Sequence, residues 1–202
     1  MSKPRVYITV LCGPERSNWI CPWLHSALLL MQSDRRFEII PGMTYGVRGY
    51  DVARNSAIEH AKKERADWIL MADNDIVPLF NPLDALASAG DRKVIGWSYA
   101  VGDGSKGDYK LFPPGERAGE FTEVGAVGGG LLAIHASVWR NIKKPLFSTF
   151  SDGFNYTPED LMFSRLAREN GFKLWTPKQL VGHMHTVDVT GLACNMDALA
   201  RK

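Results

Sequence analysis

The chain has 202 residues and a mass of 22.5 kDa, which is enough to bury one substantial hydrophobic core. Hydrophobic residues make up 45% and charged residues 23%, a globular composition that excludes a disordered chain and an integral membrane protein. The net charge is only +2 and the basic residues are dispersed, so the composition argues against nucleic-acid binding.

The cysteines and the N-terminus favour the cytoplasm. Cys12, Cys21 and Cys194 are odd in number, and their spacing matches no zinc or redox motif, so we expect no disulfide framework. The N-terminus lacks the apolar stretch and cleavage site of a signal peptide. The most apolar helical stretch, residues 23–31, is about half the ~20 residues that a membrane span requires. We therefore expect a cytoplasmic protein without a transmembrane segment.

Strand and helix patterns alternate along the first half of the chain. They predict, in chain order, a strand over residues 6–11, a helix ending near residue 33, a strand over 37–40 and a helix over about 51–65. We expect Pro41-Gly42 to stop the second strand and Asp51 to be the N-cap of the second helix.

A continuous apolar run over residues 68–72 follows and ends abruptly in Asp73-Asn74-Asp75. Such a run is typical of a strand that is buried on both faces of a parallel sheet. Together with the preceding alternation of strands and helices, it predicts an α/β fold with a mostly parallel central sheet flanked by helices.

The second half of the chain contains a long connection and three glycines in a row. The patterns predict a strand over 94–101, a functional flap or a locally disordered segment over 102–120, strands on either side of a bend at Gly128-Gly129-Gly130, a helix over 158–170 closed by Gly171, and a strand over 172–175. We see no internal repeat and no second domain, so we expect a single domain over residues 1–202.

Asp73-Asn74-Asp75 is the strongest candidate for chemistry. Ligands of open α/β sheets bind beyond the carboxyl ends of the strands, where this motif should lie. Residues two apart in an extended segment point the same way, so both carboxylates could hold Mn²⁺ or Mg²⁺ together with a diphosphate. The alternative is an ordinary solvated turn after a strand.

Four motifs in order resemble the core of GT-A glycosyltransferases of family 2. They are Asp51-Val-Ala-Arg54-Asn55 together with the strand ending in Asp73-Asn74-Asp75, the glycine strand at Gly128-Gly129-Gly130, Glu159-Asp160, and Gly182-His183. The resemblance covers about residues 5–186. It implies a GT-A domain with a nucleotide-sugar-binding part at about 1–100, an acceptor-binding and catalytic part at about 101–186, and a C-terminal tail at 187–202.

The resemblance also implies roles on the donor side. Asp75 would coordinate the metal, and Asp73 would contact the ribose or the metal through water. His183 would be the third metal ligand, although His185 faces the same side of an extended segment and could take its place. The residues that the resemblance puts beside the nucleotide are Asp51, Arg54 and Asn55, although Arg54 and Asn55 could equally be ordinary residues of the first helical turn. The donor would be a UDP- or GDP-linked sugar.

On the acceptor side, the resemblance makes Asp160 the base that deprotonates the acceptor hydroxyl, with Glu159 beside it binding the acceptor. Gly129 could let the acceptor or the sugar approach the backbone closely, or could mark only a tight bend. Acidic residues are also common at helix starts for structural reasons alone. The acceptor would be a saccharide, a lipid-linked group or another hydroxyl compound.

Two alternatives remain open. A nucleotidyltransferase that makes sugar nucleotides also combines an α/β sheet with carboxylate-bound Mg²⁺, but it usually has a glycine-rich, basic loop after the first strand. Here that strand continues as Gly13-Pro14-Glu15-Arg16, which is a poor version of such a loop and also departs from the glycosyltransferase pattern. The second alternative is a non-catalytic module that binds nucleotide-sugars or glycans.

Overall fold

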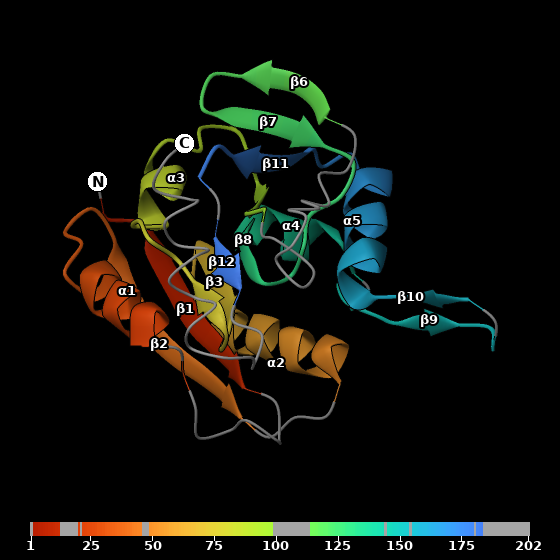
Figure 1. Ribbon diagram of the computed structural model, residues 1–202, viewed down its shortest axis with the longest axis horizontal. Helices are drawn as coiled ribbons and strands as arrows, with labels where there is room; N and C mark the ends of the chain where they lie inside the picture. Colours follow the sequence, from red (N-terminus) through yellow and green to blue (C-terminus); the bar gives the residue numbers. More distant parts are fainter. Residues whose placement is uncertain are drawn as a thin grey trace, which may run out of the picture.

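One central sheet organises the computed structural model (Figure 1). The structure describes residues 2–12, 20, 22–45, 49–98, 114–143, 145–153, 155–179 and 181–183. Within these residues the sheet has eight strands, in the spatial order β2-β1-β3-β8-β5-β11-β7-β6. Their bounds are β1 Arg5–Cys12, β2 Glu38–Tyr45, β3 Trp68–Asp73, β5 Val94–Gly96, β6 Pro114–Ala118, β7 Phe121–Val124, β8 Leu131–His135 and β11 Leu174–Pro177.

Five helices and two small strand pairs complete the described part of the fold. The helices are α1 Pro22–Gln32, α2 Tyr50–Lys63, α3 Leu83–Ala87, α4 Ala136–Asn141 and α5 Glu159–Glu169. The small pairs are β4 Ile76–Val77 with β12 Gly182–His183, and β9 Phe150–Ser151 with β10 Tyr156–Thr157. The β9–β10 hairpin projects from the body beside the start of α5 (Figure 1).

All strands of the central sheet run in one direction except β8 and β7. β1 pairs in parallel with β2 and β3, while β8 lies antiparallel between β3 and β5. β11 is parallel to β5, and β7 is antiparallel to both β11 and β6. The prediction of an α/β fold with a mostly parallel central sheet flanked by helices is confirmed.

Side chains of β3 pack into two apolar layers, because successive residues of a strand point to opposite faces. Leu70 packs in the layer that contains α1 and α3, whereas Ile69 and Met71 pack in the layer that contains α2, α4 and α5. All three side chains are fully buried. The continuous apolar run of this strand therefore reflects burial on both faces, as predicted.

β2 continues past Pro41-Gly42, so the predicted stop is wrong. The strand lies at the edge of the sheet, where Pro41 pairs with Ile8 of β1. An edge strand tolerates proline because only one of its sides has to form ladder hydrogen bonds. Glycine is required next to it, since a Cβ at Gly42 would collide with the ring of Tyr7.

The start of α2 also differs from the prediction, because its N-cap is Gly49 and not Asp51. Gly49 has a φ of +88°, a conformation that favours glycine. Asp51 lies in the first turn, where its carboxylate accepts a 2.9 Å hydrogen bond from the Val52 N–H. α5 agrees better with its prediction: it begins after Pro158, and Gly171 follows its end with a φ of +81°.

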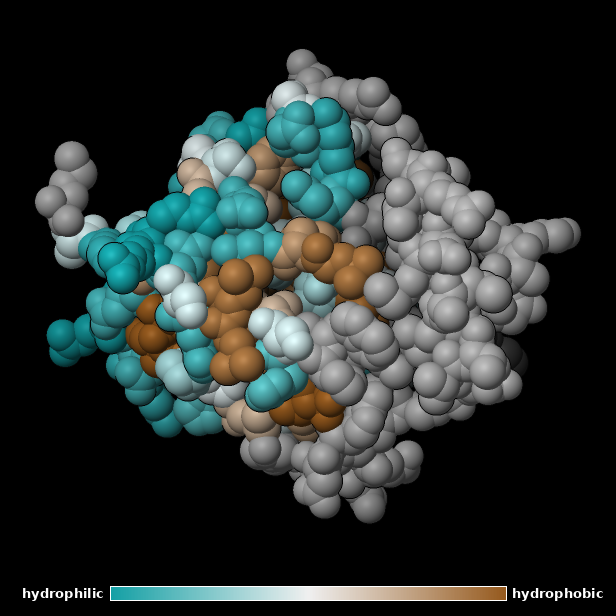
Figure 2. All heavy atoms as spheres, turned by 60° about the vertical axis from the view of Figure 1, so that its left-hand side comes forward, coloured by the Kyte–Doolittle hydropathy of each residue, from teal (hydrophilic) through white to brown (hydrophobic). Residues whose placement is uncertain are grey.

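Several predicted features lie outside the described residues. They include most of the flap over 102–120, the C-terminal tail 187–202 and His185. None of the described helices is both long and apolar enough to cross a membrane. Figure 2 brings the α1 side of the molecule forward and shows apolar patches among polar ones; Leu29 and Leu30 of α1 are about half exposed.

Candidate functional site

The motif Asp73-Asn74-Asp75 lies at the carboxyl end of β3, between the two neighbouring strands. The Asp73 N–H donates to the carbonyl of Gly130 at 2.8 Å, just before β8. The Asn74 N–H donates to the carbonyl of Leu11 at 3.3 Å, in β1. Hydrogen bonds from both neighbouring strands therefore hold the backbone of the motif. The motif lies beyond the carboxyl ends of the strands, where ligands of α/β proteins bind.

Arg54 is buried beside this motif and bridges it to the second acidic motif. Its side chain is 2% exposed, and it reaches from α2 to three other segments. The Nη2 group donates to Asp73 Oδ1 at 3.0 Å, and Nη1 donates to the carbonyl of Gly129 at 3.0 Å. Nε donates to Glu159 Oε1 at 3.2 Å, at the start of α5. One guanidinium thus joins β3, the glycine segment and α5.

Asp160 completes the cluster through the glycine segment. Its Oδ2 accepts a hydrogen bond from the Gly129 N–H at 3.2 Å, and its Oδ1 accepts one from the Leu161 N–H at 2.8 Å. Glu159 is buried against Arg54, whereas Asp160 is partly exposed. The structure therefore brings five of the predicted site residues together: Arg54, Asp73, Gly129, Glu159 and Asp160.

Burial dominates the electrostatics of the cluster. The pKa of Asp73 is raised to about 6, chiefly because burial disfavours the carboxylate; Arg54 lowers this pKa, and Asp75 and Glu159 raise it further. Burial alone would lower the pKa of Arg54, but Asp73 and Glu159 raise it above its ordinary value, so the guanidinium stays charged. The acidic groups outnumber this one buried cation.

The late histidine motif lies near the same carboxyl end of β3. In the β4–β12 pair, the backbone of His183 lies opposite Ile76, the residue that directly follows Asp75. The side chain of His183 is outside the described part of the structure, as is all of His185. Among the described residues no group of three or more His, Cys, Asp or Glu side chains is arranged to hold a metal ion.

Asp51 and Asn55 have different neighbours from Arg54. The side-chain amide of Asn55 makes two hydrogen bonds to the backbone of Phe147. Nδ2 donates to the Phe147 carbonyl at 2.7 Å, and Oδ1 accepts from the Phe147 N–H at 3.1 Å. Asp51 bonds the N–H of Val52 in the first turn of α2. These contacts connect the two side chains to the local backbone of α2 and to the segment before β9.

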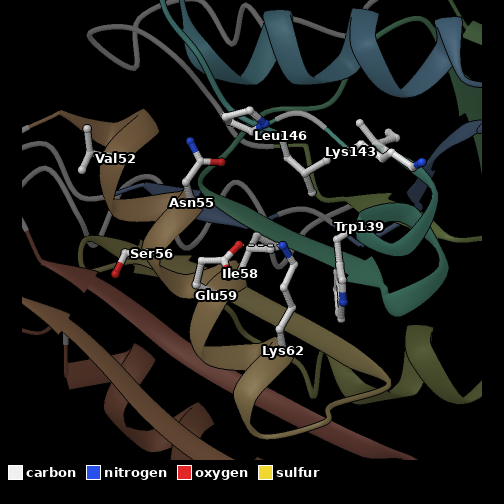
Figure 3. A pocket seen from close by; sticks show the side chains of 11 residues that line it. Val52, Asn55, Ser56, Ile58, Glu59, Lys62, Trp139, Lys143 and Leu146 are labelled. Atoms are coloured by element: carbon white, nitrogen blue, oxygen red, sulfur yellow. Dashed lines mark hydrogen bonds and ion pairs between the residues drawn. The ribbon is translucent and has the colours of Figure 1, made fainter.

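Two features of this region carry no sequence signal. The Phe147 ring lies 5.9 Å from Arg54 Cζ and stacks on Phe163 of α5 at a centroid distance of 4.7 Å. On the outer side of α2, an open groove of about 650 Å³ separates this helix from α4 (Figure 3). Trp139 and Leu146 line it, and Lys62 bonds Glu59 at its rim. The ring contacts and the groove bring together segments that are separated in the sequence, so local patterns could not reveal either feature.

No protein-family model and no curated protein matches the chain. Many solved structures are similar to it, among them the three that follow. A197 from STIV has a TM-score of 0.61 and 16% identity, over 90% of this chain and 86% of that one. A Drosophila β1,4-galactosyltransferase 7 mutant, in complex with manganese, UDP-Gal and xylobiose, has a TM-score of 0.55 and 14% identity, over 89% of this chain and 71% of that one.

The third similar structure is an apo UDP-glucose pyrophosphorylase, with a TM-score of 0.52 and 9% identity over 98% of this chain and 82% of that one. At these identities the similarity is one of fold. The chain therefore has a GT-A-like fold, which glycosyltransferases and nucleotidyltransferases share.

Proposed function

We propose that this chain is a metal-dependent glycosyltransferase, family-2-like, that moves a sugar from a UDP- or GDP-linked donor to an acceptor hydroxyl. The observation that carries the proposal is the meeting of two acidic motifs on Arg54 at the carboxyl end of β3. Support for the ligands comes from the galactosyltransferase of similar fold, whose structure contains manganese, UDP-Gal and a disaccharide.

The acidic groups fit a hard divalent cation. Asp75 and Asp73 would hold Mn²⁺ or Mg²⁺, with His183 or His185 as a third protein ligand. Burial raises the pKa of Asp73, and a bound cation would lower it by favouring the carboxylate form. When bound, the metal supplies Lewis-acid stabilisation of the negative charge that grows on the leaving diphosphate.

Asp160 would act as the general base of an inverting transfer. The acceptor oxygen forms a bond to the anomeric carbon of the donor, the bond from that carbon to the diphosphate breaks, and the acceptor proton passes to Asp160. The nucleoside diphosphate leaves with the bonding electrons. The Gly129 and Leu161 N–H groups hold the Asp160 carboxylate in one orientation at the start of a helix, which is a rigid place for a base.

A second candidate is a nucleotidyltransferase that joins a sugar phosphate to a nucleoside triphosphate, which the fold similarity to UDP-glucose pyrophosphorylase favours. Both enzymes use a nucleotide-sugar and a divalent cation. They differ in the by-product, because the nucleotidyltransferase reaction consumes or releases pyrophosphate and the glycosyltransferase reaction releases a nucleoside diphosphate. A non-catalytic nucleotide-sugar-binding module would release neither.

A thermal-shift panel tests the proposal. The purified chain is heated with UDP- and GDP-linked sugars and with nucleoside triphosphates, each with Mn²⁺, with Mg²⁺ or with EDTA. A ligand at a hundred times its Kd stabilises the folded state by about 2.7 kcal/mol. For a chain of this size that corresponds to a rise in Tm of roughly 5 to 10 °C. We expect such a rise with a nucleotide-sugar and metal, and its loss in EDTA.

Product analysis of the ligand that stabilises the chain then separates the candidates. Release of a nucleoside diphosphate supports glycosyl transfer, and dependence on pyrophosphate supports the nucleotidyltransferase. A chain that no nucleotide stabilises in the presence of either metal would contradict the whole proposal.

A further inference from the structure

Arg54 occupies a position that a direct ligand of the donor would not occupy. Only 2% of its side chain is exposed, and its three nitrogen atoms bond acceptors in three segments of the chain. An arginine that grips a phosphate presents its guanidinium to the ligand. Here the guanidinium faces Asp73, Gly129 and Glu159 in the interior of the protein.

The contacts of Arg54 extend to both halves of the proposed reaction. Its bond to Asp73 orients a carboxylate of the donor and metal side. Its bond to the carbonyl of Gly129 holds the residue whose own N–H bonds Asp160, the proposed base. The planar fork of the guanidinium makes these bonds in fixed directions, which the single ammonium of a lysine does not reproduce.

The surroundings leave Arg54 little freedom to move. A Cβ at Gly129 would lie 2.7 Å from the Arg54 Cζ, so residue 129 must be glycine for the guanidinium to occupy its place. On another side, the Phe147 ring lies 5.9 Å from the Arg54 Cζ. The backbone of Phe147 is in turn held by both ends of the Asn55 amide, one residue after Arg54 on α2.

We infer that Arg54 is a positioning residue, which sets the orientation of Asp73 directly and of Asp160 through Gly129, and which does not contact the donor. The inference rests on the proposed function and gives Arg54 a different role from the nucleotide contact that the family resemblance implies. Asn55 then positions Arg54 indirectly, because it bonds the backbone of Phe147, whose ring lies beside the Arg54 guanidinium.

The test compares Arg54→Lys with the wild type and with Arg165→Lys, a matched control. Arg165 also pairs with a glutamate, Glu169 at 2.8 Å, but it lies on the exposed face of α5. Two experiments are made: electron paramagnetic resonance of free Mn²⁺ gives the Kd for Mn²⁺ alone, and hydrolysis of the nucleotide-sugar that the thermal-shift panel selects gives kcat and KM.

We expect Arg54→Lys to weaken Mn²⁺ binding and to lower kcat, each by about 10- to 100-fold, as is usual when a partner of a metal ligand is removed. Arg165→Lys should leave both quantities unchanged. If Arg54 contacted the donor instead, KM for the nucleotide-sugar would rise while kcat and the Kd for Mn²⁺ stayed near wild type, and the inference would be overturned. An Arg54→Lys variant with wild-type values would overturn it too.

A purely structural role is distinguished by stoichiometry. A variant that is only partly folded binds less Mn²⁺ per chain, but its folded fraction keeps the wild-type Kd. If Arg54→Lys does not fold at all, Phe147→Leu replaces it, because this change removes the ring beside Arg54 and leaves every carboxylate in place. It should shift the Kd for Mn²⁺ and kcat in the same direction, and unchanged values would overturn the inference.

The wild type separates the two proposals. A wild type without metal-dependent nucleotide binding contradicts the proposed function, and the inference falls with it. A wild type that binds and turns over, beside an unaltered Arg54→Lys variant, contradicts the inference alone.

Discussion

The two acidic motifs are built on different elements, yet they divide their carboxylates in the same way. Asp73, at a strand end, and Glu159, at a helix start, both bond Arg54; we call them the inner carboxylates. Asp75 and Asp160 are the outer carboxylates: Asp75 follows the end of β3, and Asp160 bonds the N–H groups of Gly129 and Leu161.

This comparison indicates that the inner and the outer carboxylates have different roles. An inner carboxylate offsets the charge of a buried guanidinium, so its removal should disturb the structure. On α5 the outer carboxylate, Asp160, is partly exposed, whereas the inner one, Glu159, is buried. We propose that the outer carboxylates meet the metal ion and the acceptor. We therefore expect the outer pair to dominate binding and turnover, and the inner pair to dominate stability.

The largest effect is expected from Asp75→Ala. In a site with few protein ligands, a cation that loses one carboxylate is coordinated mostly by water and is no longer held by the protein. Binding of the nucleotide in the presence of Mn²⁺ should therefore fall below detection by calorimetry. Asp84→Ala is the control, because Asp84 lies exposed on α3 and pairs with Arg36 at 2.6 Å, away from the acidic motifs. Retained metal-dependent affinity in a folded Asp75→Ala protein would contradict the outer role.

Asp160→Asn should lower turnover with little effect on stability. General-base catalysis contributes about 10²- to 10⁴-fold, so kcat should fall by that factor while donor affinity in Mn²⁺ stays near wild type. Asparagine keeps one of the two oxygens that accept hydrogen bonds from the Gly129 and Leu161 N–H groups and loses the other, so the free energy of unfolding should fall by about 1 kcal/mol.

The opposite outcome would identify Asp160 as a structural residue. If kcat were unchanged and only Tm fell, the carboxylate would serve the start of α5. The base would then be Glu159 or Asp152, or the enzyme would be a retaining one without such a base. Asp152 lies at the β9–β10 turn, where its carboxylate accepts hydrogen bonds from Asn155.

Glu159→Gln tests the inner role. The amide still accepts a hydrogen bond from Arg54 but no longer offsets its charge, so the free energy of unfolding should fall by about 1 to 3 kcal/mol in urea denaturation. Turnover should fall less than in Asp160→Asn. A stable Glu159→Gln protein with a larger loss of turnover would reverse the assignment of inner and outer carboxylates on α5.

The smallest effect is expected at the late histidines. The backbone of His183 lies opposite Ile76, next to Asp75, so His183→Ala should weaken Mn²⁺ binding by roughly tenfold and more than His185→Ala does. Titration of both variants with Mn²⁺ measures the difference. If His185→Ala weakened Mn²⁺ binding more than His183→Ala, the third metal ligand would be His185 and not His183.

Local patterns in the sequence predicted the elements that carry the site. The apolar run of residues 68–72 predicted β3 and its burial on both faces, and Gly171 marked the end of α5. These features follow from side-chain alternation, helical spacing and backbone conformation, which act between residues close together in the chain. Helix α4 was not predicted, and it has only six residues.

The patterns failed where a neighbour in space decided the outcome. Pro41-Gly42 looks like a strand stop, yet β2 passes through it because it lies at the sheet edge beside Tyr7. Asn55 fits the nucleotide contact implied by the family resemblance, while in the structure its amide bonds the backbone of Phe147, ninety-two positions away.

By itself, the sequence determined the α/β class, the acidic motif at the end of a buried strand and the acidic start of a late helix. Only the tertiary structure decided that these motifs meet, because their meeting depends on β8 lying beside β3 and bringing Gly129 next to Arg54. Arg54 and Glu159 are 105 positions apart, and no periodicity connects residues at that distance. Burial of one guanidinium between them selects this pairing, since a buried charge requires partners.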